Sequence, residues 1–75
     1  MTQTITTNSE LIIYRSYAGH LSCVPSKPIC QNMVKVIPFN SEISYMGIKT
    51  LGKNRYDLFD YQGLEFIAPI DAIAH

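Results

Sequence analysis

Residues 43–68 read ISYMGIKTLGKNRYDLFDYQGLEFIA, and their alternating apolar and polar side chains predict antiparallel strands joined by short turns. The first strand, residues 43–51, would present a different set of side chains on each face: Ile43, Tyr45 and Leu51 on one, Met46 and Ile48 on the other. Gly47 lies within this strand and predicts a bulge or a tight bend, as needed to curl a sheet.

Two turns complete this meander. Gly52-Lys53-Asn54 predicts a hairpin loop, because Gly and Asn tolerate positive φ. Residues 55–60 would return with Tyr56 and Leu58 facing inward and with Arg55 and Asp57 facing outward. Residues 60–63, with Asp first and Gly fourth, favour a type I turn. A last strand over residues 64–68 would place Leu64 and Phe66 opposite Glu65.

The remaining strands are shorter, and the sequence predicts them over residues 10–17, 20–24 and 33–39. Pro25 and Pro28 indicate a loop between the last two, because proline donates no backbone hydrogen bond. Residues 1–8 are polar and Thr-rich, which favours a flexible arm or an edge strand. Residues 69–75 allow one short helical turn that would dock through Ile70 and Ile73.

These elements predict a mainly β protein. We expect a small antiparallel sheet or barrel of five or six short strands, of SH3-like or OB-like size, because turns recur at intervals of about 8–12 residues. Residues 1–8 would form the arm and residues 9–75 the single β domain.

The amino-acid composition excludes several classes of protein. Hydrophobic residues make up 47% of the chain, which is too much for a disordered protein. Six Lys and Arg balance six Asp and Glu, so no net charge attracts nucleic acid or an anionic membrane. Residues 1–8 lack the basic residue and apolar run of a secretory signal, and no apolar stretch is long enough to cross a membrane. The sequence thus predicts a cytoplasmic protein.

Cys23 and Cys30 are the only cysteines. A disulfide across the proline-containing loop is one alternative, and two packed thiols in a reducing compartment are the other. His20 adds an H-x2-C-x6-C pattern that would suit zinc, but the second close pair of ligands that structural zinc sites use is absent. We therefore predict no metal and no other cofactor.

Catalytic motifs are also lacking, and we predict that the protein is not an enzyme. No group is placed to orient His20 toward a cysteine nucleophile, and no serine lies in a G-x-S-x-G elbow. Asp57, Asp60 and Glu65 are expected to be solvated turn carboxylates rather than an acid/base pair. The glycines before Lys53 do not have the spacing of a phosphate-binding loop.

Basic and aromatic side chains gather near the predicted loop at Gly52. Lysine and arginine beside tyrosine can bind a single-stranded nucleic acid, and tyrosine also favours protein interfaces. The predicted partner-binding residues are Tyr45, Lys49, Lys53, Arg55, Tyr56 and Tyr61.

The resulting hypothesis is a non-enzymatic protein–protein interaction module that acts as a small regulator, inhibitor or accessory subunit. Small stand-alone chains are often used by phages and mobile elements to block a host enzyme or defence complex, an analogy that rests on size alone. An open edge strand would also allow a homodimer. The alternatives are a single-stranded nucleic-acid-binding barrel and a zinc or thiol protein using Cys23, Cys30 and His20.

Overall fold

The computed structural model describes residues 3–15, 19–23 and 33–75, and within them the chain forms seven strands and no helix. The predicted loop at Pro25 and Pro28, and Cys30, lie outside the described residues. The strands are β1 (Gln3–Thr6), β2 (Leu11–Arg15), β3 (Leu21–Cys23), β4 (Met33–Ile37), β5 (Glu42–Leu51), β6 (Asn54–Tyr61) and β7 (Leu64–Pro69).

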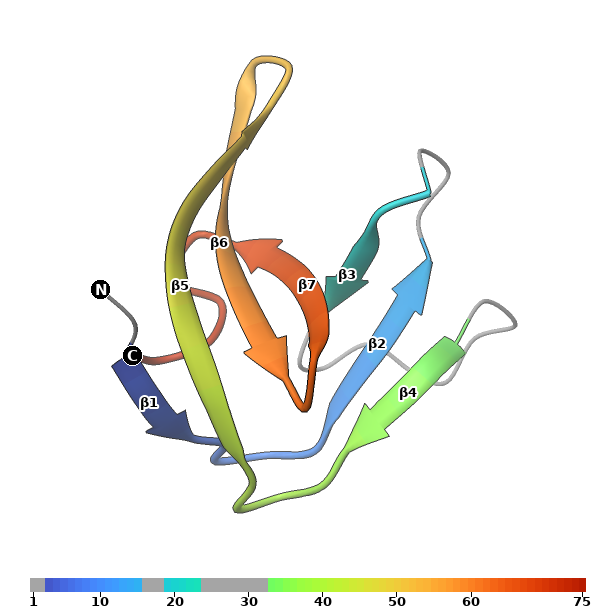
Figure 1. The fold of residues 1–75 in the computed structure, drawn as a ribbon, viewed down its shortest axis with the longest axis vertical. Helices are drawn as coiled ribbons and strands as arrows, with labels where there is room; N and C mark the ends of the chain where they lie inside the picture. Colours follow the sequence, from blue (N-terminus) through green and yellow to red (C-terminus); the bar gives the residue numbers. More distant parts are fainter. Residues whose placement is uncertain (1–2, 16–18, 24–32) are drawn as a thin grey trace.

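All seven strands belong to one strongly curled sheet, in the order β1-β5-β6-β7-β3-β2-β4 (Figure 1). The mainly β prediction is confirmed. The sheet has seven strands rather than five or six, and it is mixed, because β3 and β7 run parallel while the other pairs are antiparallel. Of the two predicted architectures, sheet or barrel, the structure has the sheet: β1 and β4 are its two edges within the described residues and do not pair, so it is not closed into a barrel.

The meander formed by β5, β6 and β7 gives one wall of the fold, and β3, β2 and β4 give the other (Figure 1). The bulge predicted at Gly47 is present: Tyr45 pairs with Phe59 and Gly47 with Leu58, so Met46 is the extra residue. Gly47 has a φ of 111°, a conformation that residues with a Cβ rarely adopt. The bulge lets the long strand β5 bend around the core.

Both hairpins of the meander close with two-residue loops. Leu51 pairs with Asn54, so Gly52 and Lys53 form the first loop, and Asn54 already belongs to β6. Tyr61 pairs with Leu64, and Gln62 and Gly63 between them both have positive φ, which defines a type I′ turn. The predicted type I turn over residues 60–63 is therefore wrong. The I′ turn matches the twist of the strands better than type I does.

The segment after β7 makes a turn instead of the predicted helical turn. The amide of Ala72 donates to the carbonyl of Pro69 over 3.0 Å, and Asp71 has a φ of 63°. Positive φ at the third turn position is the pattern of a type II turn and ends any helix. Ile73 is buried in the core as predicted, whereas Ile70 is exposed.

The core lies between the two walls and contains side chains from both. Phe59 stacks on Phe66 with ring centroids 5.6 Å apart, and Tyr45 packs against Phe59 at 5.5 Å. The buried members of this cluster are Leu11, Ile13, Cys23, Ile37, Ile43, Phe59, Phe66, Ala68 and Ile73. Burial of these apolar side chains is the main stabilising contribution to the fold.

Thr7 connects the end of β1 to the turn between β4 and β5. Its Oγ1 donates to the carbonyl of Pro38 over 3.0 Å and accepts from the amide of Ser41 over 2.8 Å. Its backbone amide donates to Ser41 and its carbonyl accepts from Asn40. Thr7 is 3% exposed, so these bonds satisfy polar groups that water does not reach. They hold the two walls together at the base of the fold.

Candidate functional site

Four of the six predicted partner-binding residues lie together at the end of the β5–β6 hairpin. Lys49 pairs directly with Tyr56, and Lys53 and Arg55 lie at and beside the loop. Tyr45 and Tyr61 lie elsewhere, Tyr45 against Phe59 in the core and Tyr61 beside Lys35 of β4. The predicted set therefore divides into one surface group and two separate tyrosines.

We call residues 48–56 the hairpin arm. Strand β1 pairs with β5 only over residues 42–45, and β7 pairs with β6 only from Tyr56 onward. Between Thr50 and Arg55 the arm is consequently a ribbon of two strands without a third, and it extends beyond the rest of the sheet (Figure 1). All residues of the arm except Leu51 and Tyr56 are exposed.

The hairpin arm carries three positive charges and no negative one. Lys49, Lys53 and Arg55 are all exposed, and they are three of the six Lys and Arg residues in the chain. Among the described residues, no ion pair to any of these three side chains is formed. Their charges are free to attract an acidic surface.

The opposite end of the same strands is acidic. Asp60 pairs across the sheet with Glu65, and Glu42 begins β5 at that end. Lys35 adds one positive charge there, with its Nζ 5.9 Å from the centre of the Tyr61 ring. The net charge of the chain is zero, but the positive and negative side chains of the meander gather at opposite ends. The total composition does not show this separation.

Apolar side chains accompany the charges of the arm. Ile48 is 48% exposed and Met46, at the bulge, is 39% exposed. Tyr56 is half-buried and lies opposite Lys49. Charged residues around an apolar contact are the usual composition of a protein-binding surface.

A second cluster lies where the last turn meets β6. Asp57, predicted to be solvated, is 1% exposed, and that prediction is wrong. The predicted inward face of β6 is wrong as well, because Asp57 and Phe59 are buried while Tyr56 and Leu58 are only half-buried. The pairing of Phe59 with both Tyr45 and Phe66 fixes this face toward the core, and Asp57 shares it.

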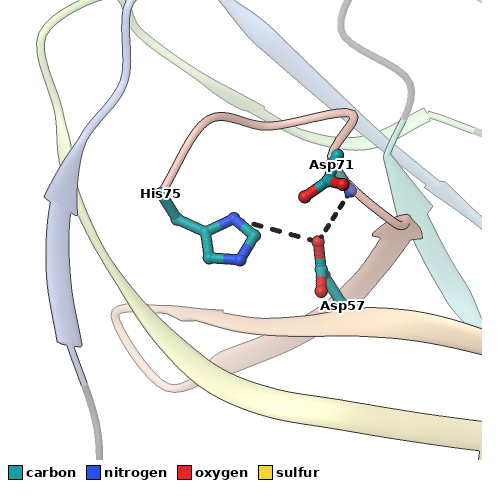
Figure 2. Close-up of side chains that lie close together, drawn as sticks. All are labelled: Asp57, Asp71 and His75. Atoms are coloured by element: carbon teal, nitrogen blue, oxygen red, sulfur yellow. Dashed lines mark hydrogen bonds and ion pairs between the residues drawn. The ribbon is translucent and has the colours of Figure 1, made fainter.

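Three groups surround the carboxylate of Asp57. Its Oδ2 accepts a hydrogen bond of 3.0 Å from the backbone amide of Asp71 and lies 3.9 Å from Nδ1 of His75 (Figure 2). Its Oδ1 accepts from the Tyr45 hydroxyl over 3.3 Å. The positive φ of Asp71 and the turn that contains it direct this amide toward β6.

The ring of His75 is held by neighbouring aromatic rings. Its centroid lies 4.0 Å from that of Tyr45 and 6.0 Å from that of Phe59, and its side chain is 17% exposed. Nδ1 lies 2.9 Å from the carbonyl oxygen of Ile73. Since a carbonyl only accepts, this contact requires the proton on Nδ1 and leaves the lone pair of a neutral ring on Nε2.

The same cluster shifts the pKa of the Tyr45 hydroxyl. Desolvation raises the pKa of the Tyr45 hydroxyl, and the negative charge of Asp57, the hydrogen bond to Asp57 and the charge of Asp71 raise it further. Each of these effects disfavours the phenolate, so Tyr45 remains a hydrogen-bond donor at neutral pH.

The sequence-based zinc or thiol site at His20, Cys23 and Cys30 gains no support from the described residues. Cys23 is a free thiol with 0% exposure, whereas His20 is exposed. Burial raises the pKa of Cys23 to about 11, so at neutral pH it is a packed thiol rather than a nucleophilic thiolate. Cys30 lies outside the described residues.

Sequence reasoning missed Asp57, Asp71 and His75 as one group. In residues 3–15, 19–23 and 33–75 this is the group of histidine, cysteine and acidic side chains able to hold a metal ion, with ligand atoms within 4.8 Å of one another. The alternation along β6 gave no decisive signal, because Asp57, Phe59 and Tyr61 share one face while Tyr56 and Leu58 share the other. The turn that brings Asp71 and His75 back to the face of Asp57 carries no signal either.

Comparison of the chain with protein-family models, with curated proteins and with solved structures found no match. Within the described part of the chain, no helix has the length and apolar character needed to span a membrane.

Proposed function

We propose that this protein is a non-enzymatic binding module whose hairpin arm docks on an acidic surface of a partner protein. The observation that carries the proposal is the charge of the arm: Lys49, Lys53 and Arg55 project from an exposed ribbon with no acidic residue among them. Such a surface speeds association with a complementary partner and orients the encounter.

The contact would combine these charges with apolar area. Tyr56 lies on the same face of the arm as Lys49, and Ile48 lies on the other face with Arg55, so each face offers one apolar side chain beside a positive charge. By covering the partner's surface, the module would act as a regulator, inhibitor or accessory subunit. We place this activity in the cytoplasm, where the free thiol of Cys23 would persist.

The test compares two variants in capture from the native host, followed by binding to the purified partner. The triple variant Lys49→Glu, Lys53→Glu, Arg55→Glu reverses the charge of the arm, and Lys35→Glu reverses one charge at the other end of the meander. We expect wild type and Lys35→Glu to retain one acidic partner that the triple variant loses. Equal binding by all three proteins would contradict the proposal.

A photo-crosslinking residue at position 53 maps the contact directly. We expect crosslinks to acidic segments of the purified partner from position 53 and none from position 65. Crosslinks from position 65 alone would place the contact at the acidic end of the meander and so refute a role for the arm.

Single-stranded nucleic acid is the alternative occupant, because Tyr56 lies opposite Lys49 and could stack on a base. A shift assay with a random oligonucleotide at low salt separates the two ideas. We expect no shift. Binding whose affinity falls steeply and log-linearly with salt would show phosphate contacts and favour this alternative.

A further inference from the structure

We propose that Asp57, Asp71 and His75 form a binding site for a divalent transition-metal ion, with Zn²⁺ as the best-suited ion. The three side chains come from β6 and from the turn that follows β7, and they converge on one point beside the core (Figure 2). This inference concerns a different surface from the hairpin arm and does not depend on the arm's function.

The first argument is the charge of the cluster. Asp57 is 1% exposed, and its hydrogen bonds come from the Tyr45 hydroxyl and the Asp71 amide, neither of which carries a positive charge. Asp71 adds a second carboxylate, with an oxygen within 4.8 Å of the other ligand atoms. Among the described residues, no lysine or arginine forms an ion pair with either. Two neighbouring carboxylates, one of them buried, are stabilised by a bound cation.

The second argument is the state of the histidine. The contact between Nδ1 and the carbonyl of Ile73 places the proton on Nδ1, which also lies 3.9 Å from Oδ2 of Asp57. The ring would therefore bind an ion through Nε2, the nitrogen on the other side of Cε1. Metal-binding histidines commonly donate their other ring N–H to a backbone carbonyl in this way. The Tyr45 ring, 4.0 Å from the imidazole, restricts its orientation before any ion arrives.

The types of ligand atom in the site determine which metal ion it would prefer. One imidazole nitrogen and two carboxylate oxygens suit Zn²⁺, whereas Ca²⁺ and Mg²⁺ prefer all-oxygen sites with more ligands. Asp71 is exposed and can adjust its position around an ion, while β6 fixes Asp57 and the neighbouring rings hold His75. Three protein ligands would leave one position of a tetrahedral ion for water.

The experiment titrates the full chain, purified without a histidine tag, with zinc chloride by calorimetry. We expect one Zn²⁺ per chain for wild type and a loss of affinity of at least about tenfold in Asp71→Asn and in His75→Gln. Both residues lie outside the β-strands, so these variants should keep the far-ultraviolet circular dichroism of wild type.

His20→Gln is the matched control, because it removes the other histidine, which lies before β3 and is exposed. It should bind Zn²⁺ as wild type does. The absorption spectrum of the Co²⁺-loaded protein adds an independent readout, and we expect no thiolate-to-cobalt charge-transfer band. Absence of wild-type binding, unchanged binding in His75→Gln, loss in His20→Gln, or a thiolate band would each overturn the proposal.

Discussion

The hydroxyl of Tyr45 on β5 donates a hydrogen bond of 3.3 Å to Oδ1 of Asp57 on β6, at the edge of the hydrophobic core. This contact joins the first two strands of the meander through a carboxylate that is removed from water. It also links the core to the turn after β7, because Oδ2 of the same carboxylate binds the amide of Asp71. Asp57 is therefore a structural residue as well as a candidate ligand.

Replacing Asp57 by alanine should destabilise the protein by about 1–3 kcal/mol, because the Asp71 amide and the Tyr45 hydroxyl lose their acceptor. Asp57→Asn keeps one acceptor oxygen and should cost about half as much or less. Urea unfolding of the two variants measures the difference. Equal stability of Asp57→Ala and wild type would show that the hydrogen bonds of Asp57 add nothing to the fold.

Stability should fall at alkaline pH because of Cys23. Burial raises its folded-state pKa from 9.0 to about 11, so the unfolded chain ionises first. The contribution is fully present below about pH 9 and is lost as pH rises toward 11. The decrease should be roughly 2 kcal/mol between about pH 8 and about pH 11.

The measurement for Cys23 is the free energy of unfolding at both pH values in wild type and in Cys23→Ala. The variant lacks a core side chain and should be less stable at both, but its decrease with pH should be smaller. Tyr45, whose pKa is also raised, affects both proteins equally. An identical pH dependence in the two proteins would contradict the prediction.

Gly47→Ala should cost about 1–3 kcal/mol, because a φ of 111° is strained for a residue with a Cβ. Apart from residue 47 itself and its two chain neighbours, no atom lies within 4 Å of the added methyl group, so the whole effect comes from the backbone. Met46→Ala, beside it on the exposed side of the bulge, is the control and should change stability by about 0.5 kcal/mol. Thermal unfolding compares the two, and a larger effect in Met46→Ala would argue against backbone strain.

Thr7→Val should destabilise the protein by about 1–3 kcal/mol, because the Ser41 amide loses its bond to Thr7 Oγ1 and the new side chain cannot replace it. Thr4→Val, on the exposed part of β1, is the matched substitution and should stay within about 0.5 kcal/mol of wild type. Denaturant unfolding distinguishes them. Similar effects from both substitutions would mean that the Thr7 bonds do not hold the walls together.

Much of the β5–β6–β7 meander was predictable because its turns carry strong local signals. Gly47, Gly52 and Gly63 occupy positions of positive φ, and the alternation of Leu64, Glu65 and Phe66 gives the correct faces of β7. The inner face of β6 was not predictable by simple alternation, because apolar residues occur on both of its faces. The pairing of Phe59 with Tyr45 and Phe66 decides it, and that is tertiary information.

The candidate sites could likewise be predicted only where their residues are close in sequence. Lys49, Lys53 and Arg55 are close in sequence, so their grouping at the arm could be predicted, whereas their separation from the acidic residues required the strand pairing. The Asp57 cluster depends on a turn at Asp71 that reverses the chain after β7. No local pattern specifies where that turn docks.

The parallel pair of β3 and β7 also bears on how the chain reaches its native state. Ser22 pairs with Ile67, and this is the register by which the two walls join. Residues so distant along the chain meet late, because closing a long loop is entropically costly before the contact is made. During synthesis, the apolar side chains of β2, β3 and β4 therefore stay uncovered until β7 has left the ribosome.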